Sequence, residues 1–181
     1  MESIQTKQLV LETLVPVINE VAHLLIEALE LGGKILIFGN GGSAADSQHI
    51  AAELVGKLLV KRRALPAIAL TTDTSALTAL ANDFGYEVVF QRQVEALGQK
   101  GDVAVGISTS GHSPNVLLAV QTAHDRGMKT VALTGRDGGP LSKVVDYSIT
   151  VPSDSTQRIQ ESHITIGHIL CELIEAHFAG V

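Results

Sequence analysis

Short apolar runs alternate along the chain with segments of helical spacing. The apolar runs cover residues 34–39, 66–70, 102–108, 129–134 and 147–152. Because they contain few polar positions, they are typical of strands buried on both faces of a parallel sheet. The segments with helical spacing cover residues 43–58, 74–81, 87–99, 114–127 and 140–145. This alternation predicts an α/β fold, a single-domain three-layer sandwich in which right-handed crossovers join five parallel strands.

Further helices are predicted at both ends of the chain. Residues 3–31 have apolar positions at helical spacing, and Pro16 should kink or divide this segment before Gly32 and Gly33 end it. Residues 155–178 form a long amphipathic segment. With these additions, the order of elements resembles a flavodoxin-like layer. In such sheets ligands bind beyond the carboxyl ends of the strands, at the switch point of the strand order.

Composition narrows the class of protein. The 181 residues suit one domain, and a hydrophobic share of 45% with only 3% aromatics predicts a largely aliphatic core. The formal charge of -6 argues against a nucleic-acid partner, which would favour a basic surface. A single cysteine, no signal-peptide pattern and no apolar run of roughly 18 residues predict a cytoplasmic protein with no membrane partner.

A glycine turn follows the first predicted strand, in the stretch "GNGGSAADS" at residues 39–47. Glycines allow a ligand to approach the backbone, and the N-terminus of the next helix presents free N–H groups. The structural alternative is a plain strand-to-helix turn with Ser43 as the N-cap. The turn has neither the G-x-G-x-x-G nucleotide pattern nor the Walker lysine, so alone it is a weak signal.

A serine-rich loop, "STSGHSPN" at residues 108–115, follows the third predicted strand. Ser108, Thr109, Ser110 and Ser113 supply four hydroxyls within six residues, next to a helix that begins near Pro114. The alternative is a polar turn with one capping residue, but four hydroxyls exceed what capping requires. We therefore favour a phosphate-binding loop here.

Four polar side chains on two predicted helices could support acid–base or metal chemistry. His49 and Glu53 share one helix face at spacing i, i+4, while Gln160 and His168 lie roughly on one side of the last helix. Imidazole, carboxylate and amide groups can hold a metal ion, and a carboxylate paired with an imidazole can move protons between adjacent carbons. Isolated helical histidines are commonly structural, and the sequence alone does not show that the two helices meet.

Five separated motifs occur in a particular order along residues 10–178. They are "FGNGGSAADSQHIAAELVG", "ANDFGYEVVF", "GDVAVGISTSGHSPN", "ALTGRDGGPL" and "RIQESHITIGHILCELIE". This set resembles the phosphoheptose isomerase family of the sugar isomerase (SIS) domain superfamily. The resemblance implies a single SIS domain over residues 1–181 and a homotetramer with active sites between subunits. Residues 3–31 would then serve oligomer packing.

The resemblance also implies an activity and the residues that carry it. The expected reaction converts D-sedoheptulose 7-phosphate to D-glycero-D-manno-heptose 7-phosphate through an enediol, the first step of ADP- or GDP-heptose biosynthesis for lipopolysaccharide or other glycans. Glu53 and His168 match the catalytic pair, and one Zn²⁺ per subunit would be held by His49, Glu53, Gln160 and His168. The substrate-binding positions match Asn40, Gly41, Gly42, Ser43, Glu53, Asn82, Asp83, Ser108, Thr109, Ser110, Ser113 and Gln160.

Two departures and two alternatives accompany this resemblance. His112 stands where the family often has Asn, and Lys57 where it often has Arg, and either could alter substrate fit. One alternative is a non-catalytic regulator that binds a sugar phosphate, similar to the DnaA initiator-associating protein of the same superfamily. The other is an isomerase of a different ketose phosphate, because the motifs define the phosphate end better than the sugar length.

Overall fold

Five parallel strands form one sheet in the order β2-β1-β3-β4-β5. This architecture is that of a computed structural model, which describes residues 1–180. The strands are β1 (Ile35–Gly39), β2 (Ala67–Ala69), β3 (Val103–Ile107), β4 (Lys129–Gly135) and β5 (Tyr147–Val151). Every neighbouring pair is parallel, so the predicted flavodoxin-like sheet is confirmed.

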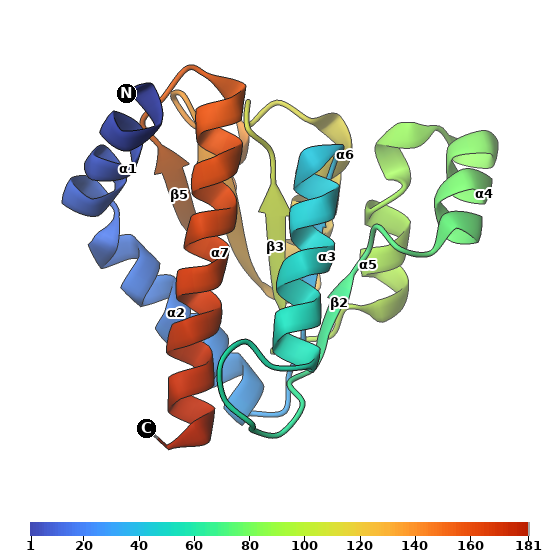
Figure 1. The fold of residues 1–181 in the computed structure, drawn as a ribbon. Coiled ribbons are helices and arrows are strands. Elements are labelled where there is room, and N and C mark those ends of the chain that lie inside the picture. The colour runs from blue at the N-terminus through green and yellow to red at the C-terminus, as the bar shows by residue number, and fades with distance from the viewer. Residues whose placement is uncertain (181) are drawn as a thin grey trace.

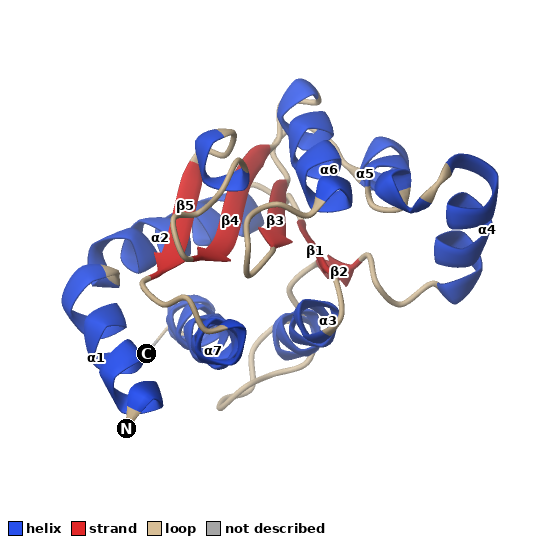
Figure 2. Ribbon diagram, turned by 90° about the horizontal axis from the view of Figure 1, so that it is seen from above, coloured by secondary structure: helices blue, strands red, loops and turns tan. Residues whose placement is uncertain are grey.

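Helices cover both faces of this sheet, which gives the predicted three layers (Figures 1 and 2). They are α1 (Glu2–Thr13), α2 (Val15–Glu30), α3 (Gly42–Val55), α4 (Thr74–Phe84), α5 (Gln91–Leu97), α6 (Pro114–Asp125) and α7 (Thr156–Ala179). The helices α2, α3 and α7 share one hydrophobic core with the sheet. The helices α5 and α6 share a second core with its other face.

The strand residues explain why the apolar runs lack alternation. Ile35 and Ile37 of β1 enter the core beneath α2, α3 and α7, whereas Leu36 and Phe38 enter the core beneath α5 and α6. All four side chains are at most 1% exposed. A strand that is buried on both faces needs apolar residues at every position.

Three helical predictions require correction. The segment predicted as 87–99 is divided into the 3-10 turn η1 (Tyr86–Val88) and the short helix α5, because the chain bends to bury Val89 and Phe90. The segment predicted as 140–145 is only the 3-10 turn η2 (Leu141–Lys143), since little chain separates β4 from β5. The helix predicted as 43–58 ends at Val55.

The N-terminal segment is divided, as predicted. Pro16 lies in the first turn of α2, and α1 and α2 meet at Leu14 with a bend of 69°. Within residues 1–180, no single helix is long and apolar enough to cross a membrane, and only the bent α1–α2 pair meets that test by length and composition.

The switch point of the sheet lies between β1 and β3. From β1 the chain proceeds to β2 on one side, whereas β3 and the later strands add to the other side. The loops that follow β1 and β3 therefore emerge side by side at the carboxyl edge of the sheet. These are the glycine turn and the serine loop identified in the sequence.

Candidate functional site

A pair of asparagine side chains joins the two loops at the switch point. Asn40, which follows β1, donates from Nδ2 to Oδ1 of Asn115 in α6, and Asn115 returns an equivalent bond, both at 2.9 Å. The Tyr86 hydroxyl donates to Asn40 Oδ1 over 3.2 Å. Asn40, Tyr86 and Ser113 belong to the lining of a pocket of about 300 Å³. The sheet edge thus holds a pocket, with polar side chains in its lining, where an α/β fold is expected to bind its ligand.

The serine loop is compact and partly enclosed. The Ser108 and Ser113 hydroxyl oxygens lie 3.0 Å apart. The helix α6 begins at Pro114, as predicted, and Ser113 occupies its N-cap position, but the Ser113 hydroxyl makes no capping hydrogen bond. Gly111 has φ +67°, and a Cβ at this position would collide with the Gly138 carbonyl oxygen. The loop therefore presents hydroxyls beside the N-terminus of a 12-residue helix, a suitable arrangement for an anion.

The glycine turn differs in detail from its structural alternative. Gly41, with φ +57°, is the N-cap, and α3 begins at Gly42, so Ser43 lies inside the first turn. A side chain at Gly42 would collide with the Gln160 amide. The glycine at this position therefore allows Gln160 of α7 to approach the start of α3 closely.

Two helices bring His49, Glu53 and His168 together. The helices α3 and α7 lie side by side on one face of the sheet (Figures 1 and 2). His49 Nε2 lies 3.3 Å from Glu53 Oε1 and 3.1 Å from His168 Nε2. One ligand atom from each residue lies within 4.8 Å of the other two, so the three could hold a metal ion. The His49 side chain is 48% exposed, which leaves the cluster open to a ligand.

Asp46 is a further polar residue at this cluster, and the sequence reading did not single it out. Burial raises the pKa of Asp46, while the charges of His49 and His168 act to lower it. Its Oδ2 atom is buried without a hydrogen-bond partner among the described residues. Asp46 precedes His49 by one helical turn, so the i, i+3 spacing could have indicated it.

Two predicted substrate-binding residues lie away from the His49–Glu53–His168 cluster, and one histidine near the cluster is a core residue. Asn82 and Asp83 are exposed at the end of α4, and Asn82 donates to Asp83 Oδ1. In Figures 1 and 2, α4 lies on the side of the molecule away from α7. His163, a further histidine of α7, is 1% exposed, and its Nε2 atom hydrogen-bonds the Thr134 carbonyl oxygen. Burial lowers the pKa of His163 to about 4, which indicates a neutral core residue.

Comparison with known proteins identifies the family. The SIS domain family model matches residues 2–135. The phosphoheptose isomerase of Aquifex aeolicus is 58% identical over 174 residues, 96% of this chain and 91% of its own length. That of Helicobacter pylori strain P12 is 62% identical over 169 residues, 93% of this chain and 88% of its own length.

A solved structure gives the same result. The phosphoheptose isomerase of Neisseria gonorrhoeae superimposes with a TM-score of 0.92 and 51% identity, over 97% of this chain and 94% of its own. These similarities extend over nearly the full length of each protein, and they confirm the resemblance inferred from the five sequence motifs. The chain therefore belongs to the phosphoheptose isomerase family of SIS-domain proteins.

Proposed function

We propose that this protein isomerises D-sedoheptulose 7-phosphate to D-glycero-D-manno-heptose 7-phosphate, the first step towards an ADP- or GDP-activated heptose. The observation that carries the proposal is the convergence of His49, Glu53 and His168 on two adjacent helices of a phosphoheptose isomerase family member. A carboxylate beside an imidazole can move protons between neighbouring atoms of a sugar.

Proton transfer is assigned to two residues of the cluster. Glu53 removes a proton from C1 of the ketose, next to the C2 carbonyl, and an enediol results. The same carboxylate returns a proton to C2, while His168 carries a proton from the C1 oxygen to the C2 oxygen. The Glu53 side chain is 21% exposed, which permits contact with a bound sugar. No external oxidant is needed, since the two carbons exchange oxidation states.

The switch-point loops are assigned to the rest of the substrate. Ser108, Thr109, Ser110 and Ser113 would ring the phosphate beside the N-terminus of α6, and the Ser108–Ser113 hydroxyl contact supports a shared anion site. Asn40, Gly41, Gly42 and Ser43 would line the sugar. The Asn40–Asn115 amide pair supports this arrangement because it holds the two loops in one place.

The residues present also fit a metal ion. His49, Glu53 and His168 provide nitrogen and oxygen donors within 4.8 Å of one another, and Gln160 of α7 would complete the set with its amide. Two imidazoles and a carboxylate favour zinc among the common ions. When bound, zinc would polarise the substrate carbonyl. Because a cation favours the ionised carboxylate and so weakens it as a base, Glu53 would be loosely ligated during turnover or alternate between its two roles.

We also propose that the protein is a cytoplasmic homotetramer with sites between subunits. The helix α4 has no buried residue; Phe84 at its end and Tyr86 just after it are 58% and 57% exposed. On α1, Ile4 and Leu11 are 67% and 69% exposed. Contact with another subunit would cover these apolar groups. It would also allow Asn82 and Asp83 of one subunit to reach a sugar bound at another.

The test is an isomerase assay on the zinc-loaded protein. With sedoheptulose 7-phosphate, the wild type should form the aldose phosphate, and a chelator should reduce the rate. Glu53→Gln should lower kcat by about 10²–10⁴-fold while phosphate binding persists. Full activity in that variant would exclude Glu53 as the base. Binding without turnover in the wild type would overturn the enzymatic proposal and favour a regulator.

A further inference from the structure

Arg62 caps the helix that carries His49 and Glu53. It lies in the segment between α3 and β2, and its side chain is 1% exposed. Its guanidinium donates from Nη2 to the carbonyl oxygen of Glu53 at 2.6 Å, and from Nη1 to the carbonyl oxygens of Leu54, Gly56 and Arg63 at 2.7, 3.0 and 3.0 Å. The last carbonyls of a helix lack helical partners, and a cation there also favours the helix dipole. Arg62 therefore holds the last turn of α3, including the backbone of Glu53.

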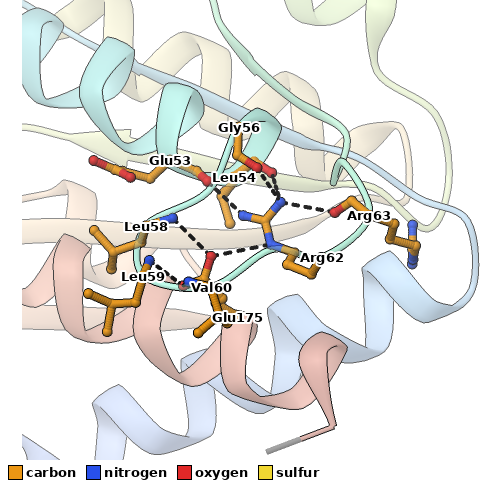
Figure 3. A network of polar contacts seen from close by, with 9 residues as sticks. All are labelled: Glu53, Leu54, Gly56, Leu58, Leu59, Val60, Arg62, Arg63 and Glu175. Carbon is orange, nitrogen blue, oxygen red and sulfur yellow. Dashed lines mark hydrogen bonds and ion pairs between the residues drawn. The ribbon is translucent and has the colours of Figure 1, made fainter.

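Glu175 holds the same segment from the helix that carries His168. Its carboxylate accepts the backbone N–H groups of Leu58, Leu59 and Val60, and Oε1 lies 3.7 Å from Arg62 Nε (Figure 3). The Glu175 side chain is 3% exposed. Burial acts to raise the pKa of Glu175, but the three N–H groups and Arg62 outweigh it and lower the pKa overall. The carboxylate is thus held in its ionised form, and both of its oxygens accept hydrogen bonds.

The two contacts form a continuous link between the two halves of the cluster. Glu175 lies seven residues after His168, so the two are about two turns apart on the same side of α7. The link continues through Arg62 to the Glu53 carbonyl (Figure 3). A shift of α3 along α7 would have to separate the Arg62–Glu175 ion pair or break the hydrogen bonds that these two side chains make to the backbone. We propose that the Glu175–Arg62 pair is a positioning device that sets the separation of His49 and Glu53 from His168, and thereby the metal affinity of the cluster.

This inference takes from the proposed function the assumption that the cluster binds a metal ion. Its test does not require turnover. The variant Glu175→Gln keeps the shape of the side chain and removes its charge. Zinc affinity of the folded protein is measured by competition with a chromogenic chelator. We expect binding to weaken at least about 10-fold, as for supporting residues around metal sites. In the isomerase assay, kcat should fall while KM for the sugar phosphate stays near the wild-type value.

A matched control is available at another buried carboxylate, just before the start of β3. Asp102, just before β3, accepts the backbone N–H groups of Lys34 and Gln99 and pairs with the Lys34 ammonium group. Asp102→Asn therefore removes the charge of a second buried carboxylate that combines backbone N–H donors with a cation. Both variants should lower the melting temperature, but Asp102→Asn should leave the zinc affinity unchanged. If both variants lose zinc affinity equally, the loss in Glu175→Gln arises from general destabilisation of the fold, and the proposal is overturned.

A second variant covers the case in which Glu175→Gln does not fold. Arg62→Lys keeps the positive charge near Glu175, but an ammonium group cannot reproduce the fork that reaches four carbonyl oxygens. It should weaken zinc binding to a similar degree. Wild-type zinc affinity in either folded variant would refute the positioning role, as would a wild type that binds no zinc. Zinc affinity that falls as expected, in a protein without isomerase activity, would support the positioning role and refute the proposed function alone.

Discussion

His49 Nε2 and His168 Nε2 lie 3.1 Å apart although 119 residues separate them in the chain. This contact exists only when α3 and α7 are packed together, so a ligand that binds both imidazoles binds only the folded state. Such a ligand stabilises the protein by mass action.

Zinc should therefore raise the stability of the wild-type protein. At a free zinc concentration of about 100 Kd, the free energy of unfolding should increase by about 2.7 kcal/mol. Thermal unfolding with and without zinc measures the effect, and His168→Ala should abolish it. His177→Ala is the matched control, because His177 lies on the same helix but pairs with Glu30, away from the cluster. An unchanged zinc effect in His168→Ala would remove His168 from the metal site.

Asp46 should support the same site without being essential for it. Its buried and unbonded Oδ2 atom, with His49 and His168 close enough to affect its pKa, suits a carboxylate that orients an imidazole. Asp46→Asn should weaken zinc binding by about 10–100-fold, the usual effect of such partners. The measurement is again chelator competition. Asp125→Asn, at an exposed carboxylate at the end of α6, serves as the control and should retain wild-type affinity.

The serine loop should determine phosphate affinity more than turnover. Ser113→Ala removes a hydroxyl that contacts Ser108 and adjoins the pocket. Loss of one hydrogen bond to a charged group should raise KM for the sugar phosphate about 10-fold, with a smaller change in kcat. Ser75→Ala, at an exposed hydroxyl in α4, should have wild-type kinetics. A Ser113→Ala variant with wild-type KM would place the phosphate elsewhere.

The sheet and its ligand-binding edge could be predicted from the sequence for a physical reason. Strands such as β1 are buried on both faces, so their apolar runs are unmistakable, and parallel topology then places the loops after β1 and β3 together. Local helix breaks were harder to predict. The burial of Val89 and Phe90 depends on tertiary packing, which ended the helical pattern predicted over 87–99.

Only part of the candidate site could be predicted from the sequence. The i, i+4 spacing predicts that His49 and Glu53 share a face, but their contact with His168 depends on how α3 packs against α7. No sequence pattern indicated a structural role for Arg62 and Glu175, because basic residues in a loop and a glutamate on an amphipathic helix are usually exposed to solvent. Their side chains are 1% and 3% exposed, a fact that only the packed structure reveals.

His163 should make stability depend on pH in a defined window. Burial lowers its pKa from 6.5 to about 4, so the folded state keeps this imidazole neutral while the unfolded state takes up a proton below about pH 6.5. Stability is therefore lost as the pH falls from about 6.5 towards 4, and this one group should cost about 2 kcal/mol between pH 7.5 and pH 5. Urea denaturation at both pH values, with chelator present throughout, measures the loss.

The control variant is His163→Gln, whose side chain cannot titrate but whose amide can still donate towards the Thr134 carbonyl oxygen. Its loss of stability between the two pH values should be smaller than that of the wild type by about 2 kcal/mol. If His163→Gln keeps the full pH dependence of the wild type, the acid sensitivity arises from other groups, and His163 is not the neutral core residue inferred from its burial.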